Sequence, residues 1–210
     1  MDMFSRKDLV RLFAPLLVEQ LLAVLVGMAD VVMVAAVGET AVSGVALVDS
    51  ISVLIIQVLS AMATGGAVVC SQYIGKKKPE QACRAAGQLV LITAALSLLI
   101  AAVAFIGNRH LLRLIFGSVE TEVMDNAETY FWFTAMSYPF LALYNSGAAL
   151  FRSLGNSKVS MKVSLAMNAI NVAGNALCVF GLHMGVEGVA IPTLLSRMFA
   201  AVVMVLLVRS

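Results

Sequence analysis

Long apolar runs make up most of this 210-residue chain, and short polar or charged segments separate them. Each run is roughly 20 to 30 residues long, which is enough to cross a hydrocarbon layer of about 30 Å as a helix. None shows the strict alternation of apolar and polar residues that is typical of a membrane β-strand. The pattern therefore predicts an all-α membrane protein with six transmembrane helices, over residues 12–37, 44–73, 82–107, 126–151, 160–182 and 186–208.

The composition also predicts a membrane location. Hydrophobic residues account for 61% of the chain, charged residues for only 12%, and the mean hydropathy is +0.97. A soluble domain of this length would carry many more charged residues on its surface. The net charge of +2 comes from loop residues, and no basic, aromatic-rich soluble segment indicates nucleic-acid binding. The three cysteines are widely spaced, which predicts small buried side chains rather than a metal site or disulfides.

Basic residues predict the orientation of the chain in the membrane, because lysine and arginine concentrate on the cytoplasmic side of membrane proteins. They occur near the amino terminus, in the second and fourth loops and at the carboxyl terminus, at Arg6, Lys7, Arg11, Lys76, Lys77, Lys78, Arg84, Arg152, Lys158, Lys162 and Arg209. We therefore expect both termini in the cytoplasm. In a bacterium, the protein would lie in the inner membrane.

The third loop, residues 107–125, departs from this pattern. Arg109 and Arg113 lie on the predicted outer side, although acidic residues follow them. The mixed composition predicts an amphipathic segment around Arg109 to Phe116 that lies along the outer membrane surface. The other basic residues outnumber this pair, so the predicted orientation is kept.

Asp30 lies deep in the first predicted helix, and no basic residue lies within ten positions of it. A carboxylate in hydrocarbon costs on the order of 2.5–3.5 kcal/mol, so Asp30 is expected to face a polar cavity or to be protonated. Glu19 precedes it by eleven residues, which places both carboxylates within about 20° of one helix face. Glu19 is closer to the inner end of the helix, where it is either functional, or simply solvated or paired with Arg11.

Three asparagines form a polar stripe along the fifth predicted helix. Asn168, Asn171 and Asn175 are spaced by three and then four residues, which places them on one face about 60° wide. In hydrocarbon these amides would lack partners, so they must meet protein or water. With the Thr193 hydroxyl and the Asp30 carboxylate they supply hard oxygen ligands for a small cation or a proton relay. The alternative is that the asparagines only form hydrogen bonds between helices.

Five short motifs occur in order along the chain: Pro15 with Asp30, Ser71-Gln72-Tyr73-Ile74-Gly75, Phe151-Arg152-Ser153-Leu154-Gly155-Asn156-Ser157-Lys158, Asn168 with Asn171, and the G-V-E-G-V-A-I-P-T segment from Gly185 to Thr193. Each resembles a landmark of the multidrug and toxic compound extrusion (MATE) transporter family. The third motif departs from the family's R-G-x-G-x-x-K loop, because Ser153 replaces the usual glycine. The resemblance covers essentially the whole chain and is to the amino-terminal six-helix half of these transporters.

The resemblance implies an antiporter that exports organic cations or other amphipathic compounds, driven by inward H⁺ or Na⁺ and without an organic cofactor. Some family members carry aspartate at the position of Asn175, so the single carboxylate here favours H⁺, with Na⁺ still open. Carried onto this sequence, the family's ion site has Asp30 as the coupling carboxylate. It is completed by Asn171, Asn175 and Thr193, with Glu19 and Asn168 as supporting polar residues.

The length of the chain limits what it can do alone. The family has twelve helices in two lobes, and the substrate cavity lies between the lobes. Residues 1–210 correspond to one lobe, and the second lobe is absent. We therefore expect either a fragment of a longer protein, completed by a second lobe in cis, or a half-size protein that pairs as a homodimer in the lipid membrane.

Three other interpretations stay open. An intramembrane enzyme would need paired catalytic groups that the sequence lacks, so we do not expect an enzyme. A lipid or glycan-precursor flippase of the related superfamily would line its lobe with several cationic residues. The predicted helices hold almost none of these, and the exception, Arg197, can instead pair with a carboxylate. The third interpretation is a membrane fragment without transport activity.

Overall fold

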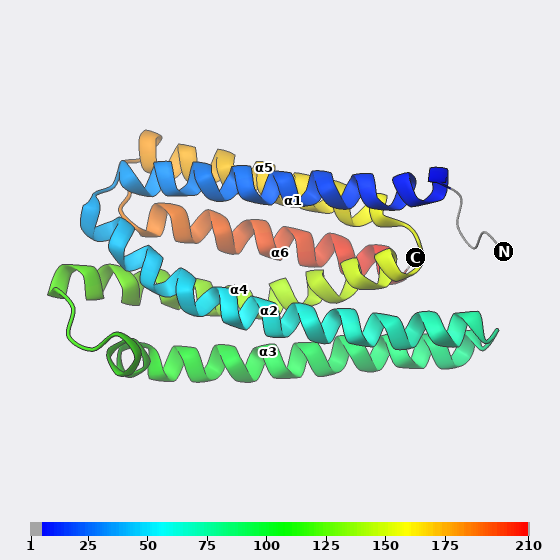
Figure 1. Ribbon diagram of the computed structural model, residues 1–210. Helices are drawn as coiled ribbons and strands as arrows, with labels where there is room; N and C mark the ends of the chain where they lie inside the picture. Colours follow the sequence, from blue (N-terminus) through cyan, green and yellow to red (C-terminus); the bar gives the residue numbers. More distant parts are fainter. Residues whose placement is uncertain (1–5, 210) are drawn as a thin grey trace.

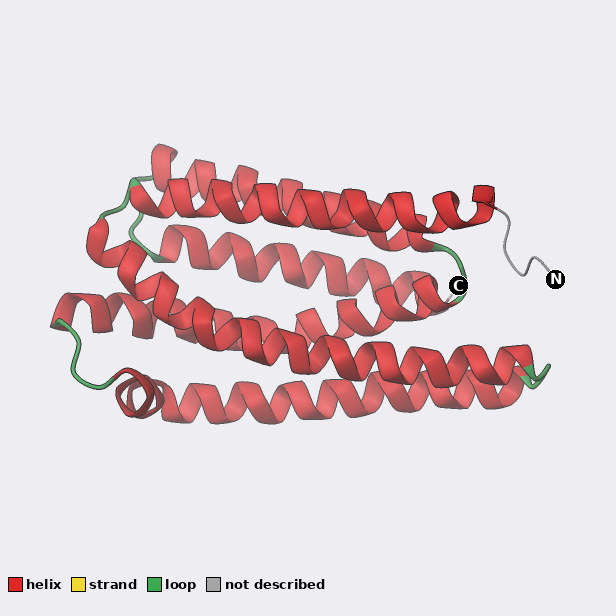
Figure 2. Ribbon diagram, in the orientation of Figure 1, coloured by secondary structure: helices red, strands yellow, loops and turns green. Residues whose placement is uncertain are grey.

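The computed structural model describes residues 6–209, and the regular elements of this part of the chain are all helices (Figures 1 and 2). Consecutive long helices run in opposite directions and are joined by short turns. The predicted all-α membrane class is confirmed. The elements are α1 (Arg6–Ala35), α2 (Glu39–Gly75), α3 (Pro79–Phe116), α4 (Thr121–Ser153), α5 (Ser157–Ala176), a π-helical turn η1 (Leu177–Gly181) and α6 (Glu187–Arg209).

Five stretches are long and apolar enough to cross a membrane: Phe13–Ala35, Glu39–Gly75, Pro79–Phe116, Ser157–Gly181 and Glu187–Arg209. The fourth predicted span, 126–151, lies within α4, which does not reach this apolarity, so the prediction of six spans is not confirmed. Helix α4 packs against α2, α3, α5 and α6 and buries polar side chains such as Ser137 and Ser146. A helix covered by other helices needs less apolar surface than one that faces lipid.

The segment that the sequence predicts to lie along the membrane surface is helical and forms the end of α3. Figure 1 shows the last turns of α3 end-on, turned away from the axis of the rest of that helix. Leu112 is fully buried, whereas Leu114 is 82% exposed, so one face of the segment packs against the bundle and the other does not. Arg109 forms a 3.0 Å salt bridge with Glu128, which ties the segment to α4.

Small residues allow close contact between helices. At Gly44 an added Cβ would lie 2.9 Å from the backbone nitrogen of Ala127, so α2 and α4 approach closely there. At Gly174 the same atom would lie 2.7 Å from the Cβ of Pro192, which brings α5 against α6. Close approach at small residues is typical of membrane helix interfaces. The second contact holds together the two helices that carry most of the amide and hydroxyl groups of the site.

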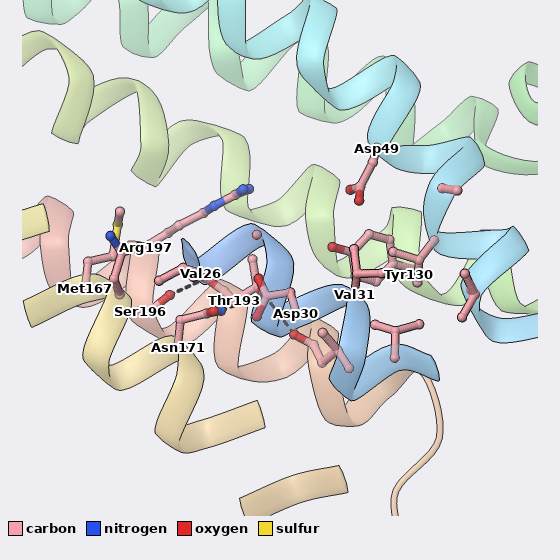
Figure 3. Close-up of a pocket in the computed structure, with 17 residues that line it drawn as sticks. Val26, Asp30, Val31, Asp49, Tyr130, Met167, Asn171, Thr193, Ser196 and Arg197 are labelled. Carbon is pink, nitrogen blue, oxygen red and sulfur yellow. Dashed lines mark hydrogen bonds between the residues drawn. The ribbon is translucent and has the colours of Figure 1, made fainter. Parts of the chain in front are cut away.

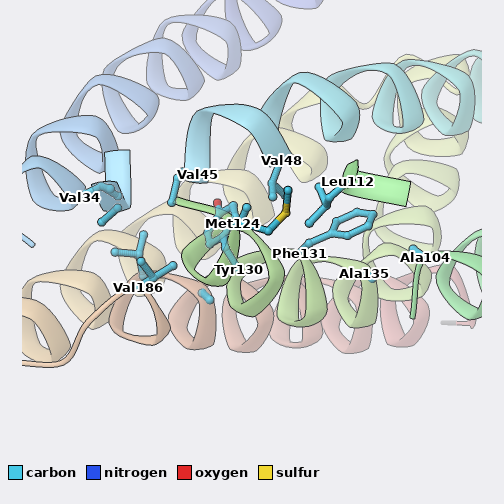
Figure 4. Close-up of a cluster of buried hydrophobic side chains, with 14 of the residues drawn as sticks. Val34, Val45, Val48, Ala104, Leu112, Met124, Tyr130, Phe131, Ala135 and Val186 are labelled. Carbon is cyan, nitrogen blue, oxygen red and sulfur yellow. The ribbon is translucent and has the colours of Figure 1, made fainter. Parts of the chain in front are cut away.

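The main hydrophobic cluster centres on α2, α3 and α4 and also includes residues of α1, η1 and α6 (Figure 4). It includes the fully or almost fully buried side chains of Val48, Leu112 and Phe131. Tyr130 belongs to this cluster and also lines the cavity described below. The core therefore fixes one wall of the candidate site.

Helix α1 lies at one side of the bundle and packs mainly against α5. The start of α1 and the end of α6 lie at the same end of the bundle (Figure 1). The location of both ends on one side agrees with an even number of long helices that run through the bundle in alternating directions. The cytoplasmic location of both termini stays a prediction.

Candidate ion and substrate cavity

A cavity of about 390 Å³ opens between α1, α2, α4, α5 and α6 (Figure 3). Its size lies within the range of about 300–1,000 Å³ that is typical of small-molecule sites. Valines and a methionine form much of the wall. The polar part of the lining consists of Asp30, Asp49, Tyr130, Asn168, Asn171, Thr193, Ser196 and Arg197.

Hydrogen bonds connect the four residues of the predicted ion site. The Nδ2 of Asn175 donates to the Oδ1 of Asp30 over 2.8 Å and also lies 3.4 Å from the Oδ1 of Asn171. The Nδ2 of Asn171 in turn donates to the Oγ1 of Thr193 over 2.9 Å. The structure thus brings all four together across α1, α5 and α6. We call these residues the Asp30 network.

Local helix geometry explains this arrangement. Asn171 and Asn175 lie one turn apart, so both side chains leave the same face of α5. Thr193 donates its own proton to the carbonyl of Val189 over 2.8 Å, which leaves its oxygen free to accept from Asn171. Each donor in the network therefore has a defined acceptor, and the direction of the hydrogen bonds is fixed.

One acceptor of the network has no partner. The side chain of Asn175 is fully buried, and its Oδ1 has no hydrogen bond within the part of the chain that the structure describes. A buried polar atom without a partner costs about 1–3 kcal/mol. This oxygen belongs to the residue that donates to the half-buried Asp30, and Asn175 itself is not among the residues that line the cavity.

The two supporting residues of the sequence prediction lie in different places. Asn168 lines the cavity but donates only a 3.5 Å contact to Ser164. Glu19 lies outside the cavity lining and accepts hydrogen bonds from Tyr144 over 3.1 Å and from Ser160 over 3.3 Å. Glu19 therefore has protein partners, and its supporting role in the ion site stays a prediction. The side chain of Arg11, its other suggested partner, lies outside the described residues.

Sequence reasoning missed Asp49, a second carboxylate that lines the cavity. It comes from α2 and is open to the cavity rather than packed among side chains. Tyr130 of α4 lies next to it (Figure 3). The signal was present, because Asp49 is an acidic residue inside a predicted membrane helix, as Asp30 is. Such residues are rare and mostly face a polar interior.

Arg197 of α6 also lines the cavity, but its partner differs from the one suggested by the sequence. Its Nη1 donates to the Oγ of Ser137 over 2.6 Å. Among the described residues the salt bridge within 4.0 Å is the one between Arg109 and Glu128, so Arg197 is not paired directly with a carboxylate. Its guanidinium nevertheless interacts electrostatically with both Asp30 and Asp49.

The chain is similar to known membrane transporters in sequence. The family model MatE matches residues 15–177. The chain is 30% identical over 199 residues to the transporter YisQ of Bacillus subtilis, and 27% identical over 203 residues to the probable multidrug resistance protein NorM of Thermotoga maritima. Each alignment covers 93% of this chain but 43% of the relative, so the chain spans less than half the length of these proteins.

Solved structures show the same fold. A MOP superfamily transporter from Pyrococcus furiosus superposes with a TM-score of 0.90 at 21% identity, over 96% of this chain and 44% of that one. An outward-facing multidrug resistance MATE family transporter of the MOP superfamily gives the same TM-score and the same coverage. The bundle of this chain therefore corresponds to a little under half of a complete transporter fold.

Proposed function

The chain belongs to the MatE family, and from this premise we propose that it forms one half of an antiporter that exports organic cations or other amphipathic compounds in exchange for H⁺ or Na⁺. The resemblance predicted from the sequence motifs is confirmed by the family match and by the relatives. The family is one of membrane transporters and not of enzymes. Relatives include multidrug resistance and multidrug export proteins, which supports the proposed class of substrate.

The observation that carries the proposal is the Asp30 network at the wall of the cavity. Asp30 is the only carboxylate of this network, and the unpartnered Oδ1 belongs to Asn175, which donates to Asp30. An ion that binds to Asp30 therefore enters a partly built set of ligands. Because Asp30 also lines the cavity, the same carboxylate attracts an organic cation, and the two cations compete for it.

We favour H⁺ as the coupling ion. Within the described residues, no group of three or more His, Cys, Asp or Glu side chains is arranged to hold a metal ion. Na⁺ at Asp30 would therefore depend on neutral amide and hydroxyl oxygens, and Asn171 already accepts a hydrogen bond through its Oδ1. A proton needs only the carboxylate itself. Na⁺ stays the second candidate, because the oxygens of the network are hard ligands.

A second six-helix lobe completes the transporter in this proposal, either in cis or as a second copy of the chain. The chain covers 43–44% of its relatives. Transporters built from repeats place the substrate site between two halves, one of which moves against the other. The mass of the protein from its natural source distinguishes the two cases. A chain of 22.2 kDa that migrates as a dimer would support the homodimer, and a chain about twice as long would support a lobe in cis.

The flippase alternative receives little support from the cavity. A phosphate-bearing headgroup needs cationic side chains, yet the lining contains Arg197 together with Asp30 and Asp49. A membrane fragment without transport activity is the remaining alternative, and the experiment below separates it from the proposal.

The test uses the protein at its full natural length in everted membrane vesicles, with a cationic dye and an imposed gradient of either H⁺ or Na⁺. Asp30→Asn keeps the size of the side chain and removes its charge, so gradient-driven dye transport is expected to be lost. The control is Asp125→Asn, because Asp125 is exposed near the start of α4 and does not line the cavity. Retained transport by Asp30→Asn would contradict the role of Asp30, and absence of transport in the unmodified protein would contradict the function itself.

A further inference from the structure

Arg197 is a positive charge inside a cavity that is proposed to bind cations. It lines the cavity together with Asp30 and Asp49, and Figure 3 shows the three side chains reaching it from α6, α1 and α2. An arginine in this place repels a cationic substrate unless it serves to balance part of the negative charge. The Asp30 network does not explain why Arg197 lines this cavity.

The position of the guanidinium is fixed by α4. Ser137 is fully buried and donates its proton to the carbonyl of Thr134 over 2.6 Å. The oxygen of Ser137 is thereby free to accept from the Nη1 of Arg197, also over 2.6 Å. A hydroxyl has one proton, so this arrangement orients the bond and holds the arginine side chain at the cavity.

Arg197 lines the cavity together with two carboxylates. In the part of the chain that the structure describes, it forms no salt bridge within 4.0 Å, yet it interacts electrostatically with Asp30 and with Asp49. Two carboxylates against one guanidinium leave a single net negative charge when all three are ionised. Charges in a partly buried cavity are costly unless they are balanced, so this net charge decides what binds.

We propose that Arg197 limits the cavity to substrates with one positive charge. It balances the charge of Asp49, and Asp30 is then balanced either by a monovalent organic cation or by the coupling ion. A compound with two positive charges would leave one of them without a counter-charge. This inference rests on the proposed function, and it adds a one-for-one exchange and a charge limit that the family assignment does not supply.

The experiment measures equilibrium binding to the purified full-length protein in detergent, with tetraphenylphosphonium as the monovalent probe and methyl viologen as the divalent probe. Arg197→Gln adds one net negative charge to the cavity and is expected to shift the preference toward methyl viologen by about tenfold or more. Asp49→Asn leaves the cavity neutral and is expected to weaken tetraphenylphosphonium binding by a similar factor. The combined Asp49→Asn, Arg197→Gln variant has the original net charge and should recover binding of the monovalent probe.

The controls separate charge from structure. Arg197→Lys keeps the charge and should keep the monovalent preference, and Arg113→Gln removes an arginine that does not line the cavity. A combined variant that does not recover binding, although its thermal unfolding matches that of Asp49→Asn, would overturn the inference. An unmodified protein that binds both probes equally well would also overturn it. If the unmodified protein binds neither probe, the proposed function fails, and the inference fails with it.

Discussion

The side-chain amide of Asn175 donates a 2.8 Å hydrogen bond to the carboxylate of Asp30 and so connects α5 with α1. Asn175 is fully buried, whereas Asp30 lines the cavity. The pair therefore joins the interior of the bundle to the wall of the cavity. A change of charge at Asn175 acts directly on Asp30.

Asn175→Asp is expected to increase the Na⁺ dependence of transport. Two carboxylates at hydrogen-bond distance cannot both stay ionised without a cation or a proton between them. The variant therefore provides the second negative ligand that a bound Na⁺ lacks in the natural chain. Dye transport measured at fixed pH over a series of Na⁺ concentrations tests this expectation.

Asn168→Asp is the matched control for this experiment. Asn168 lies on the same helix and lines the same cavity, but its amide contacts Ser164 and not Asp30. If both variants change the Na⁺ dependence equally, the effect comes from cavity charge alone. If neither changes it, position 175 does not take part in ion binding.

The members of the Asp30 network could be predicted partly from local spacing and partly from the resemblance to the MATE family. The spacing of Asn171 and Asn175 places both on one face of α5, whatever the rest of the fold. Asp30 is an isolated charge in an apolar helix and therefore needs a polar neighbour. The motif around Thr193 then indicated which other helix supplies the hydroxyl.

Asp49 and Arg197 could not be placed in the same way. Helix α2 is apolar on most of its surface, with exposed side chains such as Val53 and Leu54, so no polar face indicates how the helix is rotated in the bundle. Asp49 and Arg197 come to line one cavity because of the way α2 and α6 pack around α4. That packing is a tertiary property, and the spacing of residues along one helix does not contain it.

Glu19 shows the opposite case, in which a shared helix face did not mean a shared site. The separation of eleven positions from Glu19 to Asp30 corresponds to about 16 Å along a helix axis. Glu19 therefore meets Tyr144 and Ser160, and it forms a second polar contact between α1 and the helices α4 and α5.

Glu19→Leu is expected to lower the free energy of unfolding by about 1–3 kcal/mol, because the buried hydroxyl of Tyr144 would lose the carboxylate that accepts its proton. Glu19→Gln keeps an amide oxygen at the same place and should have a smaller effect. Ser160 tolerates either change, since it also donates to the carbonyl of Ser157 over 3.0 Å. Thermal unfolding in detergent can be followed by the fluorescence of Trp132, the only tryptophan of the chain.

A double-mutant cycle with Tyr144→Phe isolates this contact. Tyr144→Phe removes the donor, so adding it to Glu19→Leu should cost less than the sum of the two single changes. Strictly additive effects would mean that the Glu19–Tyr144 hydrogen bond does not stabilise the bundle. Because Glu19 lies outside the cavity lining, Glu19→Gln should leave the ion dependence of transport unchanged.

Gly174→Ala is expected to destabilise the protein and to reduce transport together. The added Cβ would lie 2.7 Å from the Cβ of Pro192, and the ring of a proline cannot rotate away. The two helices must then separate, which costs about 1–3 kcal/mol and stretches the hydrogen bond from Asn171 to Thr193. Gly87→Ala is the matched control, since a Cβ there meets nothing within 4 Å. Two outcomes would contradict this prediction. If Gly174→Ala unfolds at the same temperature as Gly87→Ala and transports at the same rate, the close approach of α5 and α6 does not support the site. A loss of stability alone, with transport per folded molecule unchanged, would show that the contact holds the bundle but does not position the Asp30 network.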